Sequence, residues 1–171
     1  TANQPTTYTL NAVKTGKQLQ VIEDNQALAS KLKDFNLPSK EFFVLKTEKG
    51  NELNAWIIKP KDFDASKKYP VFMYQYSGPG SQQVNNEWNS ADDYWFMMLA
   101  QQGYIVACVD GRGTGFKGAD FKKVTQKELG KYEVEDQIDA AKVIGNYPYV
   151  DKSRIGIWGW SYGGFMASNC I

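Results

Sequence analysis

One serine in this chain stands in a pattern that could make it a nucleophile. Residues 159–163 read Gly-Trp-Ser-Tyr-Gly, which is the pattern G-x-S-x-G with Ser161 at its centre. An apolar, strand-like run precedes it at residues 155–158, and a helix-like run follows it at residues 165–171. A nucleophile elbow needs this strand-turn-helix setting. The serine at its tip adopts a strained backbone, and glycines two positions to either side let the strand and the helix pack closely.

The same turn would supply part of an oxyanion site. The backbone N–H of Tyr162, one residue after the serine, would point to the place where a tetrahedral oxyanion forms. The start of the following helix also favours negative charge. The alternative interpretation of residues 159–163 is a plain Gly/Ser-rich turn between a strand and a helix. The flanking elements favour the elbow, and with it acyl transfer through a covalent serine intermediate.

A tyrosine could provide a second oxyanion donor. Tyr76 ends the apolar run at residues 71–76, and turn-forming residues follow it at 77–80. In hydrolases that use such an elbow, the loop after the corresponding strand supplies the other donor. A tyrosine hydroxyl can donate there as well as a backbone N–H does. Taken alone, an aromatic residue at a strand end is more often a packing residue, so both roles stay open for Tyr76 at this point.

A second glycine pattern points to a different chemistry, which is nucleotide binding. Gly113, Gly115 and Gly118 form G-x-G-x-x-G directly after an apolar run that ends at Asp110. A dinucleotide site needs this loop to lead straight into a helix, and a second strand that ends in an acidic residue. Residues 117–125 show no clear apolar periodicity, so we expect no helix there. The pattern therefore favours a tight loop at a strand end over a nucleotide site.

The composition excludes several kinds of site. The 171 residues contain no histidine and two cysteines, Cys108 and Cys170, so we expect no metal site, no other cofactor and no histidine base from this chain. Lys and Arg number 20 against 19 Asp and Glu, and this net charge of +1 gives no argument for a nucleic acid or a membrane surface. The apolar runs are too short to span a membrane. No leader-like segment opens the chain, so we expect any secretion signal to lie outside it.

The elements that would position these residues follow from the spacing of apolar residues and from turn signals. We expect hairpin strands at 8–13 and 18–22, a helix at 25–34 capped by Asn25, hairpin strands at 42–46 and 53–59, a strand at 71–76, a helix at 92–102 capped by Ser90 or Asn89, a strand at 104–110, a helix at 129–144, a strand at 154–159 and a helix from 162. This order predicts an α/β fold in which an antiparallel N-terminal hairpin leads into an open, mostly parallel sheet with helices.

At this point the motifs resemble a known family. Residues 150–164 resemble the elbow of the prolyl oligopeptidase family of serine peptidases, and their Gly-Trp-Ser-Tyr-Gly-Gly core is typical of the dipeptidyl peptidase IV branch. Further agreement is found at residues 76–82, 110–115, 133–137, 21–25, 38–40 and 67–70. The resemblance therefore covers nearly the whole chain.

The resemblance implies roles for particular residues. Ser161 would be the nucleophile, Tyr76 the side-chain oxyanion donor, and Tyr162 the backbone oxyanion donor. Residues 38–171 would be the truncated first part of an α/β-hydrolase catalytic domain, and residues 1–37 the last strands of a β-propeller with its linker. Family members release X-Pro or X-Ala dipeptides from peptide N-termini, often in the periplasm or outside the cell, and usually as homodimers. We therefore expect peptide substrates with Pro or Ala at the second position. We also expect that the longer protein to which this chain belongs is a homodimer with a periplasmic, cell-surface or secreted location.

The chain also departs from the complete pattern of the family. In α/β-hydrolases the acid and the histidine of the triad follow the serine, and they would lie downstream of this chain. The acidic residues that hold the substrate's amino terminus would lie upstream. The chain is therefore expected to be an internal fragment that is inactive by itself. The alternatives are a prolyl tripeptidyl peptidase or related oligopeptidase and, from a different class, a non-catalytic hydrolase-like binding module.

Overall fold

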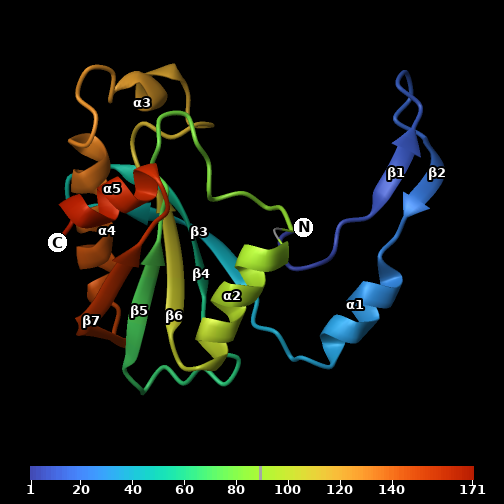
Figure 1. Ribbon diagram of the computed structural model, residues 1–171, viewed down its shortest axis with the longest axis horizontal. Helices are drawn as coiled ribbons and strands as arrows, with labels where there is room; N and C mark the ends of the chain where they lie inside the picture. Colours follow the sequence, from blue (N-terminus) through green and yellow to red (C-terminus); the bar gives the residue numbers. More distant parts are fainter. Residues whose placement is uncertain (89) are drawn as a thin grey trace.

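The computed structural model describes residues 1–88 and 90–171, and it alternates strands and helices along most of the chain (Figure 1). The strands are β1 Tyr8–Asn11, β2 Gln18–Glu23, β3 Lys40–Lys46, β4 Glu52–Ile58, β5 Tyr69–Tyr74, β6 Ile105–Asp110 and β7 Val150–Trp158. The helices are α1 Gln26–Lys33, α2 Ser90–Gln101, α3 Ala119–Lys123, α4 Tyr132–Gly145 and α5 Tyr162–Asn169. The two hairpins are confirmed, and so is the later order of strands and helices apart from the additional helix α3.

Two helices differ from the expectation. The helix expected from residue 129 begins at Tyr132 as α4, because Gly130 has a φ of 86°, which no α-helical residue adopts. The segment 117–125, expected to lack a helix, contains α3. With five residues, α3 is too short to show the apolar repeat of a helix.

The expected caps also need correction. Asn25 lies at the start of α1, but its side chain does not cap the helix. Its amide instead donates to the carbonyl of Thr6 (2.7 Å), and Asp24 accepts the N–H of Gln26 (2.9 Å). The alternative caps expected for α2, Ser90 and Asn89, lie outside the side chains that the structure describes.

A five-stranded sheet in the order β3-β4-β6-β5-β7 forms the centre of the molecule. The β3–β4 and β4–β6 pairs are antiparallel, whereas β6–β5 and β5–β7 are parallel. The sheet is thus mixed rather than mostly parallel, because β4 of the β3–β4 hairpin pairs with β6 in the antiparallel direction. The prediction of an α/β fold is confirmed.

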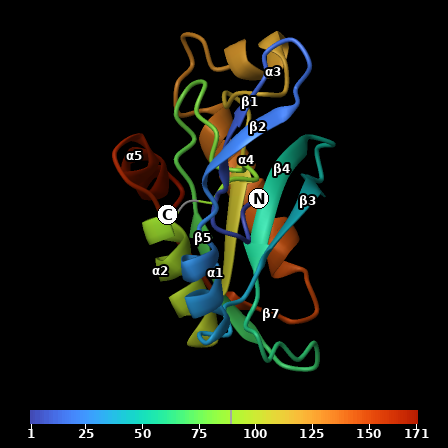
Figure 2. The ribbon, with the colours of Figure 1, turned by 90° about the vertical axis from the view of Figure 1, so that its right-hand side faces the viewer.

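Helices cover both faces of this sheet (Figure 2). Alternate residues of a strand point to opposite faces, so β6 contributes to two apolar clusters. One cluster contains Ala107 of β6 and Ile144 of α4, and the other contains Cys108 of β6 and Phe96 of α2. Because β6 is buried along its whole length, it is apolar except for Asp110 at its end.

The connections reverse direction at β5. The chain runs from β5 through α2 to its neighbour β6, and then through α4 back across β5 to β7. Parallel crossovers are right-handed, so a reversal of direction places the two helices on opposite faces. Ligands of open α/β sheets bind beyond the carboxyl ends of the strands at such a reversal. The loops after β5 and β7, which carry Tyr76 and Ser161, meet at this place.

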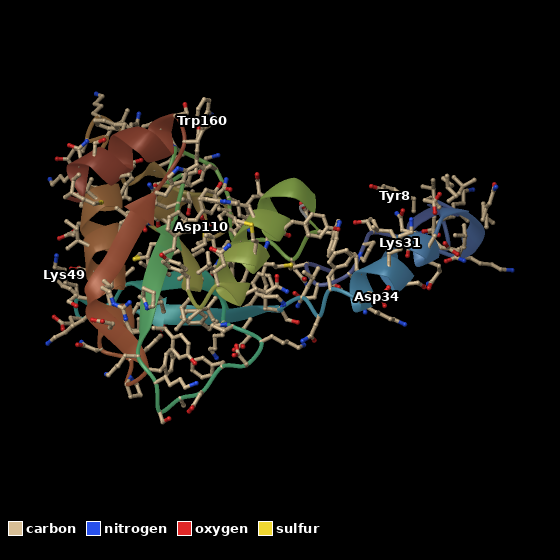
Figure 3. All side chains as sticks on the ribbon, turned by 60° about the horizontal axis from the view of Figure 1, so that its bottom comes forward. Tyr8, Lys31, Asp34, Lys49, Asp110 and Trp160 are labelled. Carbon is tan, nitrogen blue, oxygen red and sulfur yellow. The ribbon has the colours of Figure 1, made fainter. Side chains whose placement is uncertain are left out.

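The N-terminal segment stands apart from the central sheet (Figures 1 and 3). β1 and β2 form their own antiparallel sheet of two strands, and α1 leads from them to β3. Figure 3 shows Tyr8 and Lys31 in this segment, far from Trp160 in the turn after β7. Its strands carry large apolar side chains that are exposed, namely Tyr8, Leu10, Leu19, Val21 and Ile22.

Candidate active site

Ser161 lies at the tip of the turn between β7 and α5. Its φ of 55° and ψ of −116° lie outside the regions that non-glycine residues normally occupy. Such a conformation costs of order 1–3 kcal/mol and persists only where the surrounding structure holds it. Ser161 is exposed, and its hydroxyl does not cap α5. The strained turn therefore presents a free hydroxyl at the start of a helix.

Two glycines make this turn possible. A β-carbon on Gly159 would lie 2.6 Å from Nε2 of Gln75, and one on Gly163 would lie 2.5 Å from the carbonyl oxygen of Gln75. Real β-carbons do not approach other atoms so closely, so larger residues would push β7 and α5 away from the end of β5. The spacing of the glycines around Ser161 predicted that the strand and the helix need glycine at both positions, but not the contacts with Gln75.

Tyr162 has a backbone N–H at the turn of Ser161, and its side chain binds a carboxylate of α4. As the first residue of α5, it belongs to the turn whose N–H groups have no carbonyl partner within the helix. Its hydroxyl donates to Oε1 of the buried Glu133 (2.8 Å), and Oε2 of Glu133 accepts the N–H of Gly130 (3.0 Å). Burial and this hydrogen bond to a carboxylate raise the pKa of the Tyr162 phenol. The phenol therefore stays protonated and anchors the start of α5 to α4.

Tyr76 lies beside the same turn. The parallel register pairs Tyr74 with Trp158, and the N–H of Gln75 donates to the carbonyl of Trp158 (3.1 Å), so the chain leaves both strands together. The rings of Tyr76 and Tyr162 have centroids 6.3 Å apart. Gly78 leaves room for the Tyr76 ring, since a β-carbon on Gly78 would lie 3.0 Å from Cδ1 of that ring. The structure thus brings together the three residues that the sequence analysis selected.

A buried carboxylate holds the loop that follows Tyr76. Asp110, at the end of β6 and 3% exposed, accepts the backbone N–H groups of Gln83 (3.0 Å) and Val84 (2.8 Å). Burial raises the pKa of Asp110 to about 6, although these two hydrogen bonds favour the charged form. This role of Asp110 was not predicted from the sequence. An acidic residue that closes a wholly apolar strand is the signal that could have revealed it.

An ion pair joins the glycine loop to α4. The guanidinium of Arg112 donates from Nε and Nη2 to Asp136 (3.0 and 2.7 Å) and from Nη2 to Glu135 (2.6 Å). These bonds raise the pKa of Arg112. A β-carbon on Gly111 would lie 3.0 Å from that of Asp136, so the backbone approaches the carboxylate closely. Residues 110–115 and 133–137 were both recognised from the sequence as family motifs, but the ion pair that joins them was not predicted.

The first two glycines of the G-x-G-x-x-G segment pack against the Tyr76 loop, and the third, Gly118, lies at the start of α3. Gly115 donates its N–H to the carbonyl of Ser81 (2.8 Å), and Gly80 donates to the carbonyl of Gly113 (2.8 Å). A β-carbon on Gly115 would lie 3.1 Å from the carbonyl oxygen of Gly80. The glycines therefore allow two loops to pack backbone to backbone, although α3 does follow them.

A hollow of the described chain lies away from this turn. It has a volume of about 750 Å³ between α4 and β7, and Ile138, Ala141 and Ile155 line it. Neither Ser161 nor Tyr76 contributes to it.

Within residues 1–88 and 90–171, no three acidic or cysteine side chains lie close enough to hold a metal ion. None of the described helices has the length and apolarity to cross a membrane.

Ser161 has a positive φ and lies between a parallel strand and a helix, with a glycine two positions to either side. This turn on an α/β sheet is the arrangement of the α/β-hydrolase class. The comparisons with known proteins agree with this assignment. The family model described as the prolyl oligopeptidase family matches residues 89–171. The chain is 47% identical to a probable dipeptidyl-aminopeptidase B of Arthroderma benhamiae over 86% of its own length and 16% of that protein.

Solved structures show the same relationship. The crystal structure of Porphyromonas gingivalis dipeptidyl peptidase 4 matches 99% of this chain, and 24% of its own, with a TM-score of 0.95 and 51% identity. An acylaminoacyl peptidase of Pyrococcus horikoshii matches 91% of this chain, and 24% of its own, with a TM-score of 0.73 and 26% identity. The chain belongs to the prolyl oligopeptidase family, in its dipeptidyl peptidase IV branch. It spans about a sixth to a quarter of the length of these relatives.

Proposed function

We propose that this chain is the nucleophile-bearing part of a serine exopeptidase of the dipeptidyl peptidase IV type. The observation that carries the proposal is the strained backbone of Ser161 at the start of α5, next to Tyr76. A hydroxyl that stands free at a helix start is placed to attack a carbonyl, and the helix favours the negative charge that develops.

The reaction would proceed by acyl transfer. Ser161 attacks the carbonyl of the scissile bond while a base takes its proton, and the Tyr76 hydroxyl and the Tyr162 N–H stabilise the oxyanion. The tetrahedral intermediate then collapses, the scissile C–N bond breaks, and the base returns its proton to the departing amine of the rest of the peptide. The dipeptide remains as an ester on Ser161 until water hydrolyses that ester and restores the serine hydroxyl. The chain contains no histidine, so a histidine base would come from the parent protein, by which we mean the longer protein that contains this chain. We therefore expect the isolated chain to be inactive.

The parent protein would have further properties of the family. Residues 1–37 would complete a β-propeller, a role that the separate hairpin of β1 and β2 supports because its exposed apolar side chains need a partner. We propose peptide substrates with Pro or Ala at the second position, a homodimer, and a periplasmic, cell-surface or secreted location. The names of the relatives support the dipeptidyl activity.

Peptide anilides of different lengths test the proposal. The purified parent protein should release anilide from Gly-Pro and Gly-Ala substrates, and only slowly from tripeptide or N-acylated ones. Preference for a tripeptide would establish the tripeptidyl alternative. A protein that cleaves none of them and does not react with a fluorophosphonate would be a hydrolase-like binding module. The purified 171-residue chain should not turn over Gly-Pro anilide, and robust turnover by it would contradict the proposed need for an external base.

A further inference from the structure

A chain of buried amide and hydroxyl groups runs beneath the turn of Ser161. Nε2 of Gln75 donates to the carbonyl of Gly163 (2.7 Å), and the hydroxyl of Ser77 donates to Oε1 of Gln75 (3.0 Å). Nε2 of Gln137 donates to the Ser77 hydroxyl (3.3 Å) and to the carbonyl of Val109 (2.9 Å). We call Gln75, Ser77 and Gln137 the buried polar relay. Each of its members is at most 1% exposed.

The relay connects three elements that surround the proposed site. Gln75 and Ser77 follow β5, Gln137 belongs to α4, and Gly163 belongs to α5. Figure 1 shows β5 between β6 and β7, with α4 and α5 close by. An unpaired amide or hydroxyl at such depth is costly, so a movement of one member that breaks its hydrogen bonds is opposed. The relay therefore fixes the end of β5 relative to the first turn of α5.

Tyr76 stands between the two members of the relay that belong to this loop. Gln75, the residue before it, donates from its side chain to the carbonyl of Gly163 in α5 and from its backbone N–H to the carbonyl of Trp158. The residue after it, Ser77, has a φ of 61°, so the chain turns sharply there. Both neighbours of Tyr76 are thus fixed, and the direction in which its phenol leaves the backbone is fixed with them.

We propose that Gln75 is a positioning residue for the oxyanion site, and that it acts through Tyr76. Its amide sets the distance between the phenol of Tyr76 and the turn that carries Ser161. The inference rests on the proposed function, since it assigns Gln75 to the same reaction. An oxyanion donor stabilises the transition state only at the position where the charge develops, and a misplacement of 1 Å can lower the rate by about 100-fold.

A double-mutant cycle in the parent protein tests the role. Gln75→Met keeps the length of the side chain and removes both hydrogen bonds. We expect it to lower kcat for Gly-Pro anilide by about tenfold or more with little change in KM, as for an interaction made in the transition state. In a Tyr76→Phe background the same change should lower kcat by less than about twofold, because the phenol donor that Gln75 positions is already absent.

Two further variants keep the cycle decisive. Gln101→Met is the matched control, since Gln101 also donates from its amide to a backbone carbonyl (Phe35, 3.0 Å) but is exposed on α2, and its kcat should not change. Ser77→Ala replaces Gln75→Met in the same cycle if the latter does not fold.

The outcomes separate the two proposals. Equal losses of kcat in both backgrounds would overturn the positioning role while leaving the proposed function intact. A wild-type protein that neither cleaves the anilide nor reacts with a fluorophosphonate would refute the proposed function, and the positioning role with it.

Discussion

The close approach of β5 and α5 makes the glycines of the turn a sharp test of the geometry. In Gly163→Ala the new β-carbon would lie 2.5 Å from the carbonyl oxygen of Gln75, whereas ordinary contacts begin at 3.4 Å. The start of α5 must therefore move from the end of β5 by about 1 Å, because the opposing atom belongs to the backbone and cannot rotate away. A misplacement of this size costs about 100-fold in rate, or about 2.7 kcal/mol in activation free energy.

Neighbouring glycines provide matched controls in the same segment. A β-carbon on Gly164 would lie 3.4 Å from the carbonyl of Gly159, and one on Gly156 would meet nothing within 4 Å in the described chain. We expect kcat/KM for Gly-Pro anilide in the parent protein to fall by about 100-fold in Gly163→Ala and by less than about threefold in Gly164→Ala and Gly156→Ala. Similar values for all three folded variants would refute the claim that this contact shapes the site.

Other predictions concern the donor, the buried acid and the ion pair. Tyr76→Phe should lower kcat by about 100-fold with little change in KM, as measured with Gly-Pro anilide, because it removes one oxyanion donor; a loss confined to KM would contradict this role. Asp110 has its pKa raised in the folded state to about 6, so its charged form opposes folding and stability is lost as pH rises through 6. Asp110→Asn should therefore reduce the loss of thermal stability between pH 4.5 and pH 7.5 by about 2 kcal/mol, and an unchanged pH dependence would count against the raised pKa. Asp136→Ala leaves the Arg112 guanidinium without its main partner and should destabilise the domain by about 3–5 kcal/mol, seen as a lower midpoint in thermal unfolding; an unchanged midpoint would show that the pair is dispensable.

Local sequence predicted the turn of Ser161 because the strand, the two glycines and the helix that form it are adjacent in the sequence. Their spacing indicated the turn, whereas its contacts with Gln75 at the end of β5 come from the fold. Tyr76 could be selected for a related reason, since it ends a strand whose following loop has a fixed place in the fold. The positions of both residues were therefore predictable before their contacts were known.

The supporting contacts were not predictable, because they depend on the order of strands in the sheet. Asp110 reaches the Tyr76 loop, and Gln137 reaches Ser77, only because β5 lies between β6 and β7. Residues 26 to 60 positions apart in the sequence carry no periodic signal of such contacts. The hairpin of β3 and β4 was recognised, but its antiparallel pairing with β6 was not, and this pairing makes the sheet mixed.

The most direct test is to identify the residue that reacts with a fluorophosphonate. The parent protein should form a single adduct that mass spectrometry of peptides places on Ser161, and Ser161→Ala should form none. An adduct on another residue, or an active parent protein that retains its labelling after Ser161→Ala, would contradict the assignment of Ser161 as the nucleophile.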